Sequence, residues 1–561
     1  MKPPSEPLAP ATPIAVPRRA ATLIVVRDGA AGMEVLLLRR VERSGDRSSG
    51  AFVFPGGTLD AGDGRWHAQC AGLDDARASR RLGVASGGLD YYVAAIRECF
   101  EEAGVLLACD AAGELAVLDA HDVQSIDALR AQLRRGEIGL GELCDRLSLR
   151  LAADRLAYHS HWLTPPGLPK RFDTRFFIAR MPPRQTAALH SEETLEHCWM
   201  RPSHALERAT ELRLPNPTRR TLQSIAGFAS ADDCIAHAQA LRDIRRIMPL
   251  VADGPQGLRP VHPDEPVYAE IGRLDPLGAG HARYTIEPGR AVRLSPRVWR
   301  LTAPNPGVMT GPGTNTYLVG GDAACAVIDP GPDDEAHVQA IVAAAPGPIR
   351  RVLVTHTHRD HSPAARRLQA LTGAELLGLA GAHADGQDVA FVPDRSLRDG
   401  ELLSLAPDVT LRVVHTPGHA SNHLCYLLLE EKTLFTGDHV MQGSTVVINP
   451  PDGDMAAYLA SLQSLQGEDL EWLAPGHGFL MAEPRRRIEA LIRHRRAREA
   501  KVVDALRALG PASVGDLLAR VYDDVLQRLH PVAERSLLAH LLQLADEGRA
   551  LEREGRWSAA D

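Results

Sequence analysis

Three histidines and an aspartate crowd into six residues of the segment THTHRDH, as His356, His358, Asp360 and His361. The cluster directly follows the apolar run RVLV, which is typical of a buried strand. Neutral imidazole and carboxylate are ligands that suit Zn²⁺, at about 2.0–2.2 Å per bond. Packing alone does not call for so many of these side chains at one strand end, so the segment predicts metal chemistry.

Three more candidates follow: His419 in HTPGHASNH, Asp438 in FTGDHV and His477 in APGHG. Each stands near a glycine at a strand end or in a loop, where a ligand can project from a rigid edge. Any one such histidine is more often a surface or satisfied core residue, but the ordered set of seven indicates a metal centre. We expect Asp329 in VIDPG and His415 in HTPG to support it by holding loops and ligands.

In order and context, these residues resemble the metallo-β-lactamase superfamily, an αββα sandwich with two metal ions. By that resemblance, His356, His358 and His419 would hold one Zn²⁺, Asp360, His361 and His477 would hold a second, and Asp438 would bridge them. Two such metals would supply a hydroxide nucleophile near neutral pH, because metal binding lowers the pKa of water to about 7. They would also polarise the attacked carbonyl or phosphoryl group. Asp360 is the residue of this set that we expect to act in catalysis.

A second set of carboxylates lies in the segment IRECFEEAGVLL, on a helix predicted over about residues 90–103. Glu98, Glu101 and Glu102 are spaced i, i+3 and i+4, so they share one face. Stacked carboxylates repel one another, and a hard cation such as Mg²⁺ removes that cost. Taken alone, the EEAG motif is more often a solvated acidic face.

Together with the upstream turn FPGG, this helix resembles the Nudix box of diphosphate hydrolases, which use Mg²⁺ or Mn²⁺. The matching positions are Gly57, Arg97, Glu98, Glu101, Glu102 and Gly104, with Asp63 where the family has glutamate. The resemblance implies a metal held by the three glutamates, catalysis by Glu98 and Glu102, and a helix tethered by an Arg97 ion pair. Segments such as RFDTRFFIA and LPNPTRRTL look like the coenzyme A diphosphatase branch, which carries an insertion in this box.

The two halves of the box are separated by extra residues, 64–89, that are rich in Gly, Asp and Arg. We expect them to bulge out between turn and helix, since doubling a loop costs only ~0.6 kcal/mol of closure entropy.

The elements that must position both sets of residues fall into a multidomain α/β order. Boundaries follow the Pro- and Gly-rich stretches and the changes of pattern. We predict a disordered tail over 1–17, a Nudix α/β/α sandwich over 18–225, a linker over 226–292, a metallo-β-lactamase sandwich over 293–483, a basic connecting helix over 484–506 and a winged-helix-like domain over 507–561.

The basic helix and the winged helix give the C-terminal half the order of an endoribonuclease-like branch of the superfamily, which it resembles. On that basis Arg493, Arg495 and Arg496 would contact an RNA backbone. A solvated helix lying on the domain would carry the same charges. Residues 507–561 hold seven Arg against nine Asp and Glu, so the winged helix does not read as a basic DNA-binding module and could serve as a lid.

The composition further narrows the class of protein. The chain has 561 residues, 44% of them hydrophobic, and a net charge of −8, which argues for several cores and against a generally basic nucleic-acid binder. No run approaches the ~18 apolar residues of a membrane span. The eight cysteines form no CxxC pair, which predicts free thiols. We therefore expect a cytoplasmic protein that does not engage a membrane.

These patterns predict a hydrolase with two catalytic domains. The N-terminal domain would cleave a nucleoside diphosphate-linked metabolite resembling coenzyme A, and the C-terminal domain a phosphodiester such as RNA. The stretch HTPGHASNHLCY is also similar to thioester-cleaving glyoxalase II enzymes, so a thioester substrate is the alternative. For the Nudix part the alternative is a non-catalytic nucleotide sensor, favoured by Asp63 and the insertion and opposed by the three glutamates.

Overall fold

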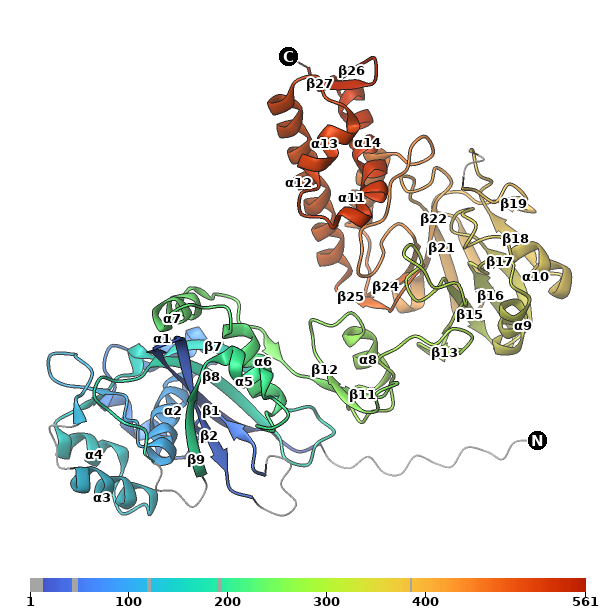
Figure 1. The fold of residues 1–561 in the computed structure, drawn as a ribbon. Helices are drawn as coiled ribbons and strands as arrows, with labels where there is room; N and C mark the ends of the chain where they lie inside the picture. Colours follow the sequence, from blue (N-terminus) through green and yellow to red (C-terminus); the bar gives the residue numbers. More distant parts are fainter. Residues whose placement is uncertain (1–13, 43–48, 119–122, 189–193, 384–385, 561) are drawn as a thin grey trace. The chain divides into compact units, whose positions relative to one another are not determined.

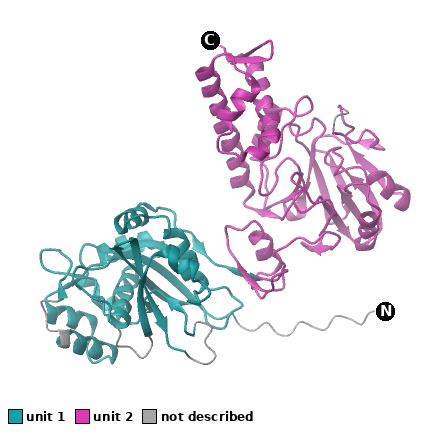
Figure 2. Ribbon diagram, viewed as in Figure 1, with its two compact units in different colours: residues 1–251 teal, residues 252–561 magenta. Residues whose placement is uncertain are grey.

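The computed structural model describes residues 14–42, 49–118, 123–188, 194–383 and 386–560 (Figure 1). The chain divides into two compact units, residues 1–251 and 252–561 (Figure 2), each of which is described by itself. Most of the tail predicted over 1–17 lies outside the described residues. Within those residues, no helix has the length and apolar content to cross a bilayer. All eight cysteines are free thiols, as predicted.

Unit 1 is built on a mixed sheet in the order β10–β7–β8–β1–β2–β3, with β4 paired to β1 and β9 to β2. Successive side chains of β1 point to opposite faces, so Leu23 and Val25 enter one core while Ile24 and Val26 enter the other. The strands are Arg18–Gly29 (β1), Gly32–Arg40 (β2), Phe52–Val53 (β3), Gly56–Thr58 (β4), Ala157–Leu163 (β7), Phe172–Arg180 (β8), Thr194–Met200 (β9) and Arg246–Ile247 (β10), with a separate short ladder of Ala108–Cys109 (β5) and Arg150–Leu151 (β6).

Helices cover both faces of this sheet, which confirms the predicted α/β/α sandwich (Figure 1). The glutamate-bearing helix α2 packs through Val93, Ile96 and Phe100 on one face. It ends at Gly104, whose φ of 69° is left-handed and favours glycine. The helices are Asp75–Leu82 (α1), Gly88–Ala103 (α2), Val123–Arg134 (α3), Leu140–Leu147 (α4), Pro202–Glu207 (α5), Asn216–Ile225 (α6) and Ala231–Ala240 (α7), with 3-10 turns at Asp63–Gln69 (η1) and Ala153–Arg155 (η3).

The insertion over 64–89 does not bulge outward, so that expectation was wrong. It folds into η1 and α1, and Leu82 of α1 is buried in the same core as α2. The Asp75 carboxylate accepts the N–H groups of Gly87 at 3.0 Å and Leu89 at 2.9 Å. The insertion therefore satisfies donors at the start of α2, a role that its length alone could not reveal.

The linker predicted over 226–292 contains the unit boundary but is largely folded, which corrects that assignment. Its α7 packs on the unit 1 sheet. Beyond the boundary, Glu270 of Tyr268–Leu274 (α8) forms a buried ion pair with Arg300 at 2.6 Å and 2.9 Å. Pro and Gly made this stretch look like a linker, while buried side chains on both sides of the boundary, such as Cys234 in the first unit and Ile271 in the second, give it a folded structure. The strands near the boundary are Leu250–Ala252 (β11) and Arg259–Val261 (β12).

Unit 2 contains two sheets that face each other across one core, in the orders β13–β14–β15–β16–β17–β18–β19 and β20–β21–β22–β23–β24–β25. Helices α9 and α10 cover the outer face of the first sheet, and α11 and α12 cover that of the second. This is the predicted αββα sandwich.

The bounds of its elements follow chain order. They are Val292–Arg293 (β13), Val298–Thr302 (β14), Asn315–Gly321 (β15), Ala324–Ile328 (β16), Glu335–Ala344 (α9), Ile349–Leu353 (β17), Ala365–Thr372 (α10), Glu375–Gly378 (β18), Arg395–Ser396 (β19), Leu402–Ala406 (β20), Val409–His415 (β21), Leu424–Leu428 (β22), Leu429–Glu431 (η4), Thr433–Gly437 (β23), Met455–Leu465 (α11), Trp472–Pro475 (β24), Met481–Ala482 (β25) and Pro484–Leu509 (α12).

The C-terminal end folds as predicted into a winged helix on the last turns of α12. Ser513 and Asp516 form a reciprocal capping box at the start of α13. Buried Leu517, Leu541 and Trp557 join the helices to the closing hairpin in one small core. The elements are Val514–Val521 (α13), Gln527–Leu529 (η5), His530–Asp546 (α14), Ala550–Arg553 (β26) and Arg556–Ala559 (β27).

Candidate metal centre

The seven predicted ligands lie where strands of the two unit 2 sheets end. Four stand on the loop after β17, and His419 stands between β21 and β22. Asp438 follows β23 and His477 lies just beyond β24, and these strands run parallel, so their ends meet. The ligand atoms come within 4.8 Å of one another in three groups: His356, His358 and His419; His356, His361 and Asp438; and Asp360, His361 and His477. Metal binding itself stays a prediction.

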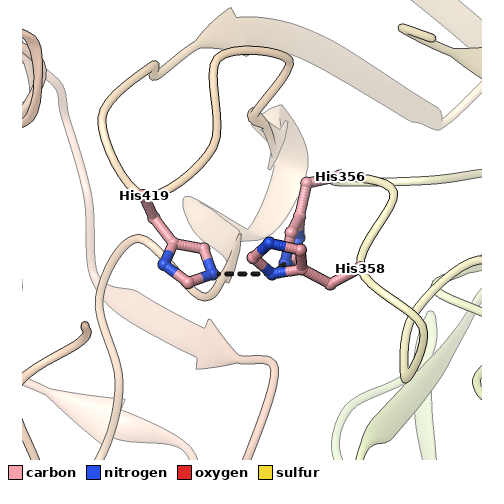
Figure 3. Close-up of side chains that lie close together, drawn as sticks. All are labelled: His356, His358 and His419. Carbon is pink, nitrogen blue, oxygen red and sulfur yellow. Dashed lines mark hydrogen bonds between the residues drawn. The ribbon is translucent and has the colours of Figure 1, made fainter. Parts of the chain in front are cut away.

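The first group brings three ring nitrogens together. His356 Nε2 and His419 Nε2 lie 2.9 Å and 3.0 Å from His358 Nδ1 (Figure 3). His419 Nδ1 lies 2.7 Å from the Val447 carbonyl oxygen, which can only accept, so His419 keeps its proton there and turns an Nε2 lone pair toward the other rings. His356 Nδ1 is likewise held, 3.0 Å from the Thr355 hydroxyl. Nitrogens arranged in this way fit a shared cation.

The second and third groups share His361, and together they are called the second group below. This second group leaves buried polar atoms without hydrogen-bond partners. His361 Nε2 and Asp438 Oδ1 are two such atoms, 3.5 Å apart. Asp360 Oδ2 lies 3.4 Å from Nε2 of both His361 and His477. Buried polar atoms are normally satisfied, so orphaned nitrogen and oxygen atoms that face one another mark a place for a cation. This donor set fits the metal ions that the sequence predicts.

The two groups differ in charge. Burial, with the neighbouring histidines, lowers the pKa of His356 well below its usual value and that of His358 to about 3, so both rings are neutral, as a metal ligand must be. Burial also opposes charge on His477, but Asp438 and Asp360 outweigh it and raise its pKa to about 9. Burial works against an ionised Asp438, but His477 and His361 lower its pKa well below normal. The second group thus holds protons that a metal would displace.

Asp329 holds this centre together, as predicted. Its Oδ1 accepts the Thr355 N–H at 2.7 Å, and its Oδ2 accepts the Thr355 hydroxyl at 2.8 Å and the His361 Nδ1–H at 2.9 Å. His361 Nε2 is thereby turned toward the other ligands. His415, by contrast, is exposed, and its ring reaches only the Ser421 carbonyl at 3.5 Å. The prediction that His415 helps to hold the metal centre is therefore wrong.

Asp329→Asn tests this arrangement. An amide can accept from Thr355 or from His361 but no longer offers a charged carboxylate to both, so His361 should lose its fixed orientation. We expect metal affinity at the centre to fall by about 10- to 100-fold, as for other groups that orient metal ligands. Chelator competition measures it. Asp322→Asn, at an exposed turn, is the matched control, and equal affinity in the two variants would contradict this role.

The sequence did not single out the residues that seat His477. Asn315 donates from Nδ2 to the carbonyl oxygens of Pro475 at 3.0 Å and Gly478 at 2.8 Å, on either side of that histidine. Thr314 donates its hydroxyl to Asp360 Oδ2 at 3.3 Å. The polar pair TN at the head of an apolar strand was the available signal, since buried polar side chains need partners.

A second network, also missed, ties the ligand loops to each other. Asp452 accepts the Ser421 backbone N–H at 3.2 Å and the Gln387 amide at 2.7 Å. Asn422 donates to the Thr357 hydroxyl at 2.8 Å. These contacts join the loop of His358 to that of His419, which lie far apart in the sequence.

A cavity of about 870 Å³ opens on this centre and is lined by His358, Asp360, His419 and Asp438. Its other walls come from residues 441–449, from α12, and from the winged helix over 522–536. Apolar side chains form much of the lining: Val308, Met309, Met441, Val446, Val447, Val525, Leu529, Val532 and Ala533. The winged helix is therefore a wall of the cavity.

Only one of the three arginines expected on an RNA backbone reaches this cavity. Arg495 lines it and is buried. Arg493 and Arg496 are exposed and do not line it. The RNA-backbone contact by Arg493, Arg495 and Arg496 stays a prediction, but α12 turns Arg495 to a different face from the other two.

In unit 1, Arg97 is the hub of the predicted Nudix box. Its Nε donates to Asp63 Oδ1 at 3.0 Å, and its Nη2 donates to the Thr58 carbonyl at 3.0 Å. Its Nη1 lies 2.9 Å from Glu98 Oε1 and 3.3 Å from Glu101 Oε2. Asp63 is 1% exposed, and both of its carboxylate oxygens accept from Arg97, so it holds the arginine in place. The shorter side chain is thus used for tethering.

The turn FPGG contacts the same helix closely. A Cβ on Gly57 would lie 2.4 Å from the Glu98 carboxyl carbon, so any larger residue there would displace the Glu98 carboxylate. The Gly56 N–H donates to Glu102 Oε2 at 2.9 Å. Burial raises the pKa of Glu98 to about 7 against the opposing effect of Arg97. Within the described residues, Glu98, Glu101 and Glu102 are not gathered into one group of converging ligand atoms, and their metal binding stays a prediction.

Family models match three stretches of the chain. The metallo-beta-lactamase superfamily matches residues 309–477, a NUDT19 Nudix domain matches residues 73–218, and a beta-lactamase associated winged helix domain matches residues 513–557. Their order is the one that the sequence predicts.

Several relatives align with about two fifths or more of the chain. A lactamase-like protein, vrtG, of Penicillium aethiopicum is 35% identical, over 39% of this chain and 68% of its own length. A beta-lactamase-like protein 2 homolog of Drosophila melanogaster is 31% identical, over 46% of this chain and 90% of its own length. An atrochrysone carboxyl ACP thioesterase of Aspergillus fumigatus is 32% identical, over 42% of this chain and 75% of its own length.

Solved structures are similar to parts of the chain. A beta-lactamase domain protein from Burkholderia ambifaria is 24% identical, with a TM-score of 0.43, over 49% of this chain and 96% of its own. A NUDIX hydrolase from Alicyclobacillus acidocaldarius is 26% identical, with a TM-score of 0.33, over 40% of this chain and 97% of its own.

Proposed function

The chain belongs to the metallo-beta-lactamase superfamily and is a hydrolase that also carries a Nudix domain and an associated winged helix domain, and from this premise we propose that unit 2 hydrolyses acyl thioesters. The observation that carries the proposal is the cavity. One end of it is formed by the candidate metal ligands and much of the rest by apolar side chains of the sheet loops and the winged helix. An acyl chain fits such walls, while its thioester carbonyl reaches the ligands.

An RNA substrate, the other reading of the sequence, has less support. A strand of phosphates requires a row of cations, and Arg493 and Arg496 lie away from the cavity. Relatives named as ACP thioesterases favour the thioester as well.

We propose Zn²⁺ as the ion, because five of the seven positions that converge are imidazoles and the other two are carboxylates. His356, His358 and His419 would hold one ion, and Asp360, His361 and His477 the other, with Asp438 shared. Bound there, the metals would supply Lewis acidity and an activated water. The chain itself excludes bulk water with its apolar walls and orients the ligands through Asp329. Asp360 is the residue of this set that we propose to act in catalysis, and its carboxylate is held by a hydrogen bond from the Thr314 hydroxyl.

For unit 1 we propose hydrolysis of a nucleoside diphosphate-linked metabolite of the coenzyme A kind, with Mg²⁺ or Mn²⁺ held by Glu98, Glu101 and Glu102. The raised pKa of Glu98 and the glycine turn against it support this role, because a buried carboxyl with a pKa of about 7 suits proton transfer. A coenzyme A thioester would join the two activities in one substrate pool. The unpaired cysteines support a cytoplasmic location.

A substrate panel tests the proposal on the full chain. Acyl-coenzyme A, acyl-N-acetylcysteamine, short RNA and ADP-ribose are offered in parallel, with Zn²⁺ or Mg²⁺ added. We expect release of free thiol from the thioesters with Zn²⁺, and diphosphate cleavage only with Mg²⁺ or Mn²⁺. Cleavage of RNA without thiol release would overturn the thioester proposal in favour of phosphodiester hydrolysis.

A further inference from the structure

One arginine in the wall of the unit 2 cavity is buried without a counter-ion. Arg495 is 3% exposed and lines the cavity. Its Nη2 donates to the Val446 carbonyl, while its Nε is buried and has no hydrogen-bond partner. Its guanidinium lies 5.4 Å from the ring centroid of Tyr458. Among the described residues no carboxylate forms an ion pair with it, so its full positive charge faces the cavity.

Two other arginines of α12 have acidic partners. Arg498, one turn later on α12, pairs with Asp524 at 2.7 Å and 3.2 Å. Arg493, two residues earlier, is exposed and lies 3.9 Å from Glu489. A buried charge without a partner is costly, and an aromatic ring offsets only part of that cost. Arg495 therefore has the properties of a side chain whose partner arrives with the ligand.

The surrounding cavity has the same sign of charge. Arg359 and Arg535 also line it, and among the residues that the structure describes the carboxylates in its wall are Asp360 and Asp438 of the metal centre. The cavity thus has a ligand-rich end that would bind metals and a cationic region beyond it. A guanidinium in a dry site binds carboxylate and phosphate oxygens strongly and with defined geometry.

We propose that Arg495 is the centre of an anion subsite, and that the substrate of unit 2 is a thioester with an oxyanion remote from the reacting carbonyl. This rests on the proposed thioester hydrolysis. The oxyanion is a carboxylate on the far end of the acyl group or a phosphate on the thiol side. Arg495 is a specificity determinant that binds this group, while the metal centre acts on the carbonyl.

Binding of small acids tests the subsite without any turnover. Hexanoate and adipate have the same length, and only adipate has a second carboxylate. We expect the zinc-loaded full chain to bind adipate more tightly than hexanoate by about tenfold or more in calorimetry, the usual gain from a charged hydrogen-bonded pair. Arg495→Met should remove that difference, Arg495→Lys should keep part of it, and Arg493→Met should leave it unchanged. Equal affinities for the two acids in the wild-type chain would overturn the carboxylate form of the subsite.

Turnover then separates the two sources of the anion and the two proposals. Hexanoyl and adipyl thioesters of N-acetylcysteamine test the acyl side, and hexanoyl-coenzyme A tests the phosphate. We expect kcat/KM for one of the anionic substrates to exceed that for the neutral one, and the excess to disappear in Arg495→Met, whose fold is checked by its melting temperature. If Arg495→Met does not fold, Arg495→Lys provides the comparison. A wild-type chain that binds adipate selectively yet cleaves no thioester would keep the subsite and reject the thioesterase. Cleavage with no preference for any anion would reject the subsite alone.

Discussion

Asp438→Asn is expected to lower kcat/KM for the best unit 2 substrate by about a thousandfold, since the metals of such a site contribute several kcal/mol to the transition state. The reason lies in its position. Its Oδ2 is 3.8 Å from His419 and its Oδ1 is 3.3 Å from His477, so one carboxylate reaches both groups of ligands. An amide in its place offers one neutral oxygen to two cations. Steady-state kinetics with a chromogenic thiol reagent measures the loss.

Two controls frame that result. His415→Ala removes a nearby histidine that is exposed at the end of β21. This variant should retain activity. The diphosphatase activity proposed for unit 1 should be unchanged in Asp438→Asn. An asparagine variant within a factor of about ten of the wild type, less than one lost charged contact usually costs, would contradict the shared-ligand role.

Arg97→Leu is expected to have the largest effect on stability, lowering the free energy of unfolding of unit 1 by about 3–5 kcal/mol. Removing the guanidinium leaves Asp63 buried and charged without its partner, and releases Glu98 and Glu101 to repel each other. Hydrogen exchange of peptides from α2 measures the change directly, and diphosphatase activity should be lost with it.

Arg39→Leu is the matched control. This arginine of β2 pairs with the exposed Glu42 at 3.3 Å, and exposed ion pairs contribute about 0–1 kcal/mol. Exchange protection of α2 that is equal in Arg97→Leu and Arg39→Leu would show that Arg97 does not organise the helix.

The placement of the candidate metal ligands could be predicted because each lies near a strand end, and the neighbouring sequence indicates that strand end. An apolar run, a polar cluster and a glycine are enough to locate His356, Asp438 or His477 at an edge, and the fold then brings the edges together. The Glu98 helix was predictable for a similar reason, because its apolar and acidic positions follow the helical period.

What could not be predicted depends on contacts between distant segments. Asn315 holds the loop of His477 by donating to the Gly478 carbonyl, more than a hundred residues away in the sequence. The sequence near either residue does not indicate this contact. The insertion was expected to be a loose loop because its composition is polar, yet Leu82 anchors it in the core. Likewise, no local pattern shows that the winged helix would complete the cavity or that Arg495 would be buried while Arg493 is not.

Elemental analysis of the purified full chain tests the central claim most directly, which is that the converging side chains of unit 2 hold a pair of metal ions. The structure predicts two tightly bound transition-metal ions per chain after dialysis against buffer, and fewer in Asp438→Asn and in His358→Ala. A wild-type chain that hydrolyses thioesters with no bound metal, or whose metal content is unchanged in both variants, would contradict the account.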